Sequence, residues 1–248
     1  MPPFSNNLRN AILGAALVLA AGLVLSALIG AYAFSTVRSA DQTLSVTGSE
    51  KKRVVSDSVK WVILLSREVT EGNVPSGYRD IGRDLTAVTD FLKGKGLAGA
   101  DITVSPPTVS ENFFYDPSGS RGPRRFAVRQ EISVASSEVA RVTEVAKDAS
   151  ELASRGITFE ARQPEYFYSK LSELRVELLS AAIRDAKARA TEIARGSDRG
   201  VGKLKSASSG VVQVLAPNSI EVADYGQYDT SSIEKEVMVT VRATFFVR

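Results

Sequence analysis

The sequence predicts an α+β fold with a mostly antiparallel sheet and helices packed on one face, preceded by one transmembrane helix. Three observations predict it. Residues 11–34 form an uncharged run. Several short segments alternate apolar and polar residues, as half-buried strands do. Longer segments repeat apolar residues at helical spacing. Because strand pairs alternate with helices along the chain, we expect the order ββαββαβαββ.

The uncharged run is long enough to cross a bilayer. As a helix, 24 residues reach about 36 Å, which exceeds the roughly 30 Å hydrocarbon core. We favour an uncleaved signal anchor at 11–34, with residues 1–10 as a short tail and 35–41 as a linker. A cleaved signal peptide, with residues 31–33 as its small-residue site, stays open. The short N-terminus favours a cytoplasmic tail and a domain outside the cytoplasm.

Residues 42–248 are expected to form one α+β domain. The alternating segments predict strands at 43–46, 59–65, 102–109, 126–136, 157–163, 201–217 and 236–248. Pro106 and Pro107 interrupt the third of these, which is typical of an edge strand or a bulge. In the last strand the inward residues are Val237, Val239, Val241, Ala243, Phe245 and Val247.

Helices are expected at 74–96, 138–156 and 169–195. The last has Ser169 as a candidate N-cap and Gly196 just past its end. It also carries a row of alanines four residues apart: Ala182, Ala186, Ala190 and Ala194. Small side chains let a sheet or a second helix approach closely, and apolar neighbours add buried area. The row therefore predicts a packing helix and no chemistry.

Composition excludes several classes of site. The chain has no Cys and no His, which excludes the usual zinc sites, His- or Cys-ligated haem, and Cys or Ser-His catalysis. The net charge of +3 argues against a nucleic-acid binder, which needs a basic face. We therefore predict no catalytic residue, no cofactor and no metal ligand.

Three local patterns match chemical motifs in the wrong context. GKGLAG (94–99) follows a helix and precedes a strand, so it lacks the helix N-terminus that holds a pyrophosphate. SEKK (49–52) and SIEK (232–235) both match S-x-x-K without its supporting motifs. Asp80 and Asp84 lie four apart beside Arg79 and Arg83, which favours a solvated charged face over a cation site or an acid/base pair. We interpret all of these as structural.

Two segments combine aromatic and basic or acidic residues, as contact surfaces do. The alternative is that their aromatics fold back onto the domain. The candidate subunit-contact residues are Phe113, Phe114, Tyr115, Arg121, Arg124, Arg125, Tyr225 and Tyr228.

Four stretches resemble the SIMPL-domain (YggE-like) family of bacterial envelope proteins. They are AAIRDAKARATEIA (181–194), GVGKLKSASSG (200–210), VMVTVRATFFV (237–247) and TLSVTGSEKKRVVSDSV (43–59). The family's first strand pair characteristically reads V-x-G-x-G, whereas this chain has Thr47-Gly48-Ser49 and lacks the second glycine. The resemblance covers about residues 42–248.

The resemblance implies an α+β protein of the periplasm or the bacterial inner membrane. It also implies self-association, in some members into rings, and a link to oxidative-stress tolerance. No catalytic residues are carried over, and the long span at 11–34 departs from members with a cleavable signal. We therefore expect a single-pass, non-catalytic envelope protein that forms a homo-oligomer.

Two alternatives stay open. One is a stomatin-like membrane scaffold, although such chains continue into a long coiled helix and this one ends in a strand. The other is an enzyme or solute-binding protein using Asp, Glu, Arg or Tyr. A pocket gathering Asp80 or Asp224 with a basic partner would favour it.

Overall fold

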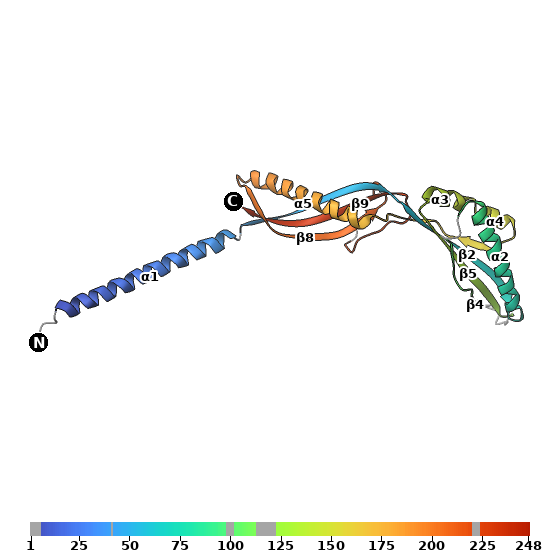
Figure 1. Cartoon of the computed structure of the whole chain (residues 1–248), viewed down its shortest axis with the longest axis horizontal. Coiled ribbons are helices and arrows are strands. Elements are labelled where there is room, and N and C mark those ends of the chain that lie inside the picture. The colour runs from blue at the N-terminus through green and yellow to red at the C-terminus, as the bar shows by residue number, and fades with distance from the viewer. Residues whose placement is uncertain (1–5, 41, 98–101, 113–122, 220–223) are drawn as a thin grey trace, which may run out of the picture. The chain divides into compact units, whose positions relative to one another are not determined.

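A computed structural model describes residues 6–40, 42–97, 102–112, 123–219 and 224–248, with side chains described from residue 9 onward and not for 35–40. Figure 1 shows its elements. The helices are α1 (Asn6–Ala40), η1 (Glu71–Asn73, a 3-10 turn), α2 (Val74–Gly94), α3 (Val139–Lys147), α4 (Ser150–Ser154) and α5 (Leu171–Arg195). The strands are β1 (Thr43–Val55), β2 (Ser58–Thr70), β3 (Ile102–Val104), β4 (Thr108–Asn112), β5 (Arg125–Ser136), β6 (Phe159–Ala161), β7 (Glu165–Phe167), β8 (Val201–Leu215) and β9 (Glu234–Val247). The fold is α+β, as predicted.

The described part of α1 is apolar and lies apart from any core. Residues Arg9–Phe34 have the length and composition to cross a membrane, and none of this 26-residue stretch is buried. In a folded chain, a run of exposed Leu, Val and Ile side chains marks a surface that another apolar phase covers. The helix is therefore a membrane anchor or a signal sequence.

The chain divides into two compact units, the first of which includes α1. Unit 1 comprises residues 1–50, 179–210 and 240–248, and unit 2 comprises 51–178 and 211–239. The elements β1, α5, β8 and β9 contribute residues to both. The domain boundaries expected from the sequence stay predictions.

Unit 2 contains a six-stranded antiparallel sheet centred on the long antiparallel pair β2 and β5. Their register places Trp61 opposite Val134, and Ile63 opposite Ile132. Outside this pair, β3 and β4 join β5, and β6 and β7 join β2. One sheet face is thus a continuous apolar surface, because paired residues point to the same side.

Three helices cover that face of the unit 2 sheet. The core includes Val59, Trp61, Ile63 and Leu65 of β2, with Ile81, Val88, Phe91 and Leu92 of α2 and Val142, Val145 and Leu152 of α3 and α4. Trp61 is fully buried, and its Nε1 donates to the carbonyl of Arg162 at 2.9 Å. The helical spacing predicted for α2 is confirmed by this burial.

Unit 1 is built around a sheet with the order β1-β9-β8. Helix α5 turns its alanine row inward: Ala182, Ala186 and Ala190 are fully buried and Ala194 is 3% exposed. The closest approach is at Gly48 of β1, where an added Cβ would lie 2.7 Å from Ala186 Cβ and nearer still to backbone atoms of Ala182 and Ala186. The predicted packing role of the alanines is confirmed.

Several local expectations are wrong in detail. The first strand runs from Thr43 to Val55 rather than ending at residue 46, because the sheet continues through the basic stretch. The predicted helix over 138–156 is two helices, α3 and α4. Ser169 does not cap α5, which begins at Leu171; its hydroxyl instead donates to Asp57 at 2.7 Å. The strand expected at 102–109 is split at its prolines into β3 and β4.

Candidate functional site

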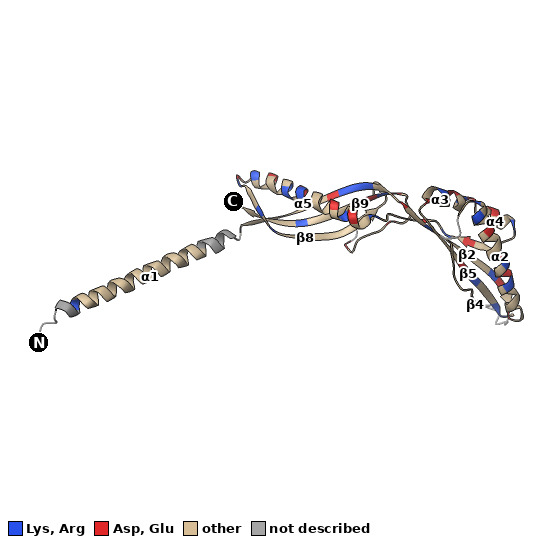
Figure 2. Cartoon of the chain, in the orientation of Figure 1, with Lys and Arg blue, Asp and Glu red and all other residues tan. Residues whose placement is uncertain are grey.

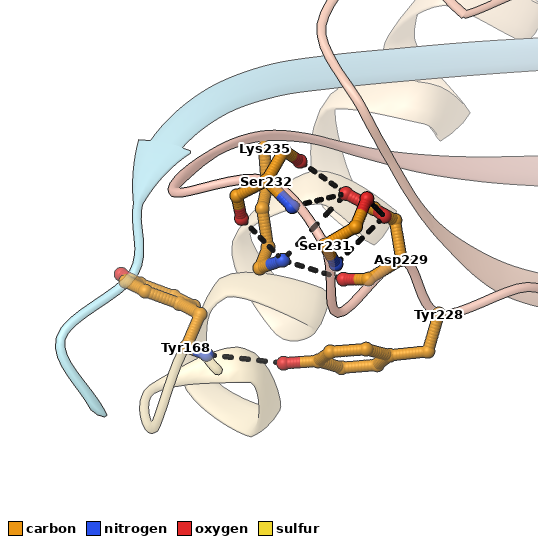
Figure 3. A network of polar contacts seen from close by, with 6 residues as sticks. All are labelled: Tyr168, Tyr228, Asp229, Ser231, Ser232 and Lys235. Carbon is orange, nitrogen blue, oxygen red and sulfur yellow. Dashed lines mark hydrogen bonds and ion pairs between the residues drawn. The ribbon is translucent and has the colours of Figure 1, made fainter. Parts of the chain in front are cut away.

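The most elaborate polar cluster in the described chain surrounds a buried lysine of unit 2 (Figure 3). Lys235 begins the buried stretch of β9, and its side chain is fully buried. Its Nζ donates to the backbone carbonyls of Asp229 and Ser232, the latter at 2.8 Å, and lies 3.8 Å from an Asp229 carboxylate oxygen. Burial lowers the pKa of Lys235, and the Asp229 carboxylate partly offsets this.

The carboxylate of Asp229 holds the turn that precedes this lysine. One oxygen accepts from the amide and hydroxyl of Ser231, at 3.0 and 2.6 Å, and the other accepts from the amide of Ser232, at 3.2 Å, and from its hydroxyl. Burial favours the neutral acid, but these hydrogen bonds and the charge of Lys235 outweigh it and lower the pKa of Asp229 to about 2. The charged groups of Asp229 and Lys235 therefore stabilise the turn between them.

This geometry explains the S-x-x-K pattern at 232–235. A Ser-Lys catalytic pair requires the lysine within reach of the serine hydroxyl. Here Lys235 binds the carbonyl of Ser232, whereas the Ser232 hydroxyl donates to Asp229. In the second match, Ser49 donates its amide to Asp185 and Lys52 binds Glu177. Each lysine stabilises structure in these contacts.

Of the three tyrosines predicted as contact residues, Tyr225 and Tyr228 are described, and they are placed differently. Tyr228 folds back: its hydroxyl accepts from the amide of Tyr168 at 3.0 Å, and its ring centroid lies 6.0 Å from that of Phe167. Lys235 Nζ lies 5.7 Å from the same ring. Tyr225 is 90% exposed beside Gly226, whose φ is +88°. Of the two, Tyr225 is the more exposed, at 90% against 38% for Tyr228.

The other candidate contacts fall mostly outside the described residues: Phe113, Phe114, Tyr115 and Arg121. Arg124 is described, and it binds Glu111 through two nitrogens at 2.7 Å and Glu71 at 2.8 Å. These carboxylates raise its pKa. Arg125 is exposed and lies in register with Thr70 and Asn112. Whether any of these residues contacts a second copy stays a prediction.

The acidic pair on α2 is not simply a solvated face. Asp84 is buried, and both of its oxygens accept from Arg67 of β2, at 2.6 and 2.8 Å. The interpretation was correct for Asp80, which pairs with Arg83, and wrong for Asp84. Together with Arg155 these residues line a pocket of about 370 Å³. The carboxylates are neutralised by arginines, so the pocket presents guanidinium groups.

The glycine motif at 94–99 ends helix α2, as predicted from the sequence. Gly96 follows α2 with φ +82°, which is the geometry of a helix stop. Gly99 lies outside the described residues. Within the described ranges, no three Asp or Glu side chains gather in a way that could hold a metal ion.

The comparisons with known proteins identify the family. A family model described as SIMPL, a protein of unknown function (DUF541), matches residues 44–245. The chain belongs to the SIMPL family. The predicted resemblance is thereby confirmed, and the matched residues span parts of both units of the SIMPL domain.

No curated protein matches the chain. Among solved structures, it is similar at 15% identity to a chain described as a "putative amidohydrolase/peptidase" from Burkholderia cenocepacia, with a TM-score of 0.18. That match covers 50% of this chain and 31% of the other. A likeness at this level carries no argument about the fold or the activity.

Proposed function

We propose that this SIMPL protein is a non-catalytic component of the bacterial envelope. Its N-terminal helix anchors it in the inner membrane, its SIMPL domain lies on the periplasmic side, and copies assemble through that domain. The assembly protects the cell under oxidative or envelope stress. The observation that carries the proposal is an open edge of the unit 1 sheet, on a chain that also holds a span-length apolar helix.

The edge in question belongs to β8, one of the two end strands of the order β1-β9-β8. In its unit 2 part, the outer side of the strand is covered by the segment 227–229: the amide of Val214 donates to the carbonyl of Gln227, and the amide of Asp229 donates to Val214, both at 2.8 Å. In its unit 1 part, β8 ends the sheet, and no described strand pairs with the outer side of residues 201–210. Unpaired backbone groups on such an edge are a template for a strand of another chain.

The side chains of this edge are also uncovered. All seven residues from Lys203 to Ser209 are exposed, on both faces of the strand. Edge lysines such as Lys203 and Lys205 discourage random pairing. An antiparallel pairing of two β8 strands about Ser206 places Lys203 opposite Ser209 and Lys205 opposite Ala207, so no like charges face each other directly. We propose this symmetric pairing as the subunit contact.

Adjacent proline substitutions test the contact. Successive amides of a strand point to opposite edges, so one of Ser206→Pro and Ala207→Pro removes an amide from the open edge and the other removes one from the pairing with β9. We expect the first to reduce the particle mass in mild detergent with little loss of stability, and the second to lower stability. Light scattering measures the mass, and circular dichroism measures the unfolding midpoint. A wild-type particle that is monomeric at micromolar concentration contradicts self-assembly.

The anchor and its orientation need a separate test. Intact mass of the protein from membranes distinguishes an uncleaved anchor, with residues 9–34 present, from a cleaved signal peptide. Because the chain has no cysteine, Ser150→Cys on α4 gives a single labelling site. Labelling by an impermeant maleimide in spheroplasts supports the periplasmic orientation, and labelling only after lysis contradicts it.

The protective role is tested in cells. Deletion of the gene is expected to reduce survival in peroxide, and the full-length protein is expected to restore it. The Ser206 or Ala207 variant that prevents assembly without loss of stability is expected to fail in this restoration. If that variant restores survival in peroxide, protection does not depend on assembly, and the proposed link between the two is wrong.

One observation favours a second candidate, a solute-binding role. The unit 2 pocket gathers Asp80 with Arg67, Arg83 and Arg155, the combination that this alternative requires. No acidic partner of Arg155 is found among the described residues, and its guanidinium lies 5.8 Å from the ring of Phe91. Guanidinium groups suit a small carboxylate or phosphate. Calorimetry with citrate and inorganic phosphate tests this, with Arg155→Gln as the variant that removes binding.

A further inference from the structure

One end of the unit 1 sheet collects basic residues beside the point where the anchor enters. The strand β1 begins there, and Gln42 accepts from the amide of Val247 at 2.9 Å. Gly200, in the turn after α5, exchanges two backbone hydrogen bonds with Arg248, at 2.7 and 3.0 Å. One edge of unit 1 therefore contains the start of β1, the last turn of α5 and the end of β9.

Two guanidinium groups at this end have no acidic partner among the described residues. Arg199 donates to the side-chain oxygen of Gln42 at 2.6 Å, a neutral partner, and Arg248 is exposed. Arg195 adds a third guanidinium that is shared with Glu192. Asp198 is the acidic residue of the turn. The basic residues at the end of α5 are visible in Figure 2.

The arginine side chains are not the donors to the backbone carbonyls at the end of α5. Backbone amides of the turn cap them: Gly196 donates to Glu192, and Ser197 and Arg199 donate to Ala194, at 2.9 to 3.1 Å. A helix C-terminus carries partial negative charge that opposes a bound anion. Because turn amides cap these carbonyls, the guanidinium of Arg199 keeps a neutral partner, Gln42, and no described helix carbonyl neutralises it or Arg248.

A pocket of about 290 Å³ opens at the same place. Its polar side is formed by Arg199, Ser197 and Gln42, and its apolar side by Leu44, Ile193 and Val247. A cationic group next to aliphatic side chains matches a phospholipid headgroup with the upper part of its glycerol and acyl chains.

The chain connection keeps this end near the membrane. Eight residues, 35–42, join the end of the span at Phe34 to β1, so even fully extended they reach about 28 Å. Since α1 continues to Ala40, six of the eight rise about 1.5 Å each and the reach is about 16 Å. The surface potential of an anionic leaflet acts over about 8–10 Å. This end of unit 1 is therefore the one that can meet the headgroups.

We propose that Arg199 and Arg248, with the pocket beside them, bind anionic phospholipid headgroups of the leaflet in which the anchor ends. The proposal rests on the proposed function only in requiring an uncleaved anchor. It gives the SIMPL domain a defined contact with the membrane surface in addition to its tether.

Lipid competition on the full chain tests the proposal. The protein in nonionic detergent receives equal amounts of phosphatidylglycerol and phosphatidylcholine, and native mass spectrometry counts the lipids retained. We expect a preference for phosphatidylglycerol that falls about 25-fold in the R199Q/R248Q double variant, since each of the two surface charges contributes a factor of about five. Arg199→Lys keeps the positive charge, so this variant is expected to retain most of the preference for phosphatidylglycerol.

A matched control removes two other charges of unit 1. Arg184 and Lys187 are exposed on α5, at least eight residues before its end. R184Q/K187Q is expected to leave the lipid preference unchanged; an equal loss in both double variants overturns the proposal in favour of diffuse charge. No preference in the wild type also overturns it. Circular dichroism confirms that the variants are folded.

Two further outcomes separate related hypotheses. Displacement of the lipid by millimolar glycerol phosphate identifies a site for soluble anions and overturns the lipid assignment; no displacement supports it. The intact mass from the same spectrum reports residues 9–34. If these are absent, the proposed anchor fails, whereas an anchored chain without phosphatidylglycerol preference contradicts this inference alone.

Discussion

The two units of the SIMPL domain pack helices on sheets in opposite ways. Unit 2 fills the space between its layers with Trp61, Ile63, Leu65, Leu92 and other large side chains. Unit 1 brings α5 onto its sheet through alanines and one glycine, so the backbones approach closely and the core cluster is small. Close packing makes both arrangements sensitive to volume, but in opposite directions. We expect substitutions that remove buried atoms to destabilise unit 2 most, and substitutions that add atoms to destabilise unit 1 most.

The largest expected effect is a cavity in unit 2. Ile63→Ala removes a fully buried side chain that lies in register with Ile132 and Ala161. We expect the free energy of unfolding to fall by about 4 kcal/mol. Urea titration followed by the fluorescence of Trp61, the sole tryptophan, measures it. Lys60→Ala, at an exposed position on the same strand, is the control; a loss below about 1 kcal/mol for Ile63→Ala contradicts the packing described here.

The converse experiment adds one methyl group to unit 1. Gly48→Ala places a Cβ against the backbone of α5 at Ala182 and Ala186, and we expect a loss of about 3 kcal/mol. Hydrogen exchange of residues 182–195 measures the loss of protection within unit 1. Because the blocking atoms include backbone, Ala186→Gly is not expected to rescue the variant.

Its matched control is Gly82→Ala on α2. An added Cβ at Gly82 meets nothing within 4 Å, so the substitution is expected to be neutral or to stabilise the helix by about 0.5–1 kcal/mol. Unchanged exchange of residues 182–195 in Gly48→Ala would remove the contrast between the units.

Periodicity in the sequence predicted which faces are buried, and this is confirmed for α5 and for β9 from Val237 to Phe245, whereas Val247, predicted to point inward, is only half-buried. The alanine row of α5 and the alternation of Val241, Ala243 and Phe245 in β9 are both buried as expected. These patterns are local, because each follows from the geometry of one element. The same reasoning ended the first strand at residue 46, but did not show that the strand continues through Gly48 to Val55.

The contacts that the sequence did not predict join distant segments. Asp84 pairs with Arg67 from another element, and Ser169 binds Asp57 across 112 residues of chain. Lys235 was missed as a buried residue because a lysine is rarely fully buried without a specific set of partners. Those partners are backbone carbonyls of the turn, which leave no signal in residue type.

Each unit also contains a carboxylate that organises backbone, and the one in unit 2 is expected to matter more. Asp229→Asn removes a carboxylate whose pKa is about 2 against an ordinary 3.8, so it should cost about 2 kcal/mol at pH 7. Its pKa is depressed, so this stability is present above about pH 4 and is lost as the pH falls toward 2. Urea titrations of both proteins from pH 7 to pH 2 should therefore converge at the acid end. A constant gap contradicts the assignment.

The equivalent carboxylate of unit 1 is Asp185, and its effect is expected to be the smallest. It accepts from the amide of Ser49 at 2.8 Å and from Arg189 at 2.8 Å, and these bonds lower its pKa. Its side chain is 30% exposed, so Asp185→Asn should cost about 1 kcal/mol at pH 7. Arg189→Gln keeps the bond to Ser49 and removes an exposed pair, which should cost about 0.3–0.5 kcal/mol. Hydrogen exchange at Ser49 separates the two, because its amide loses a charged acceptor in the first variant alone; equal exchange in both variants would mean that the carboxylate acts through Arg189 rather than on the strand that Gly48 brings against α5.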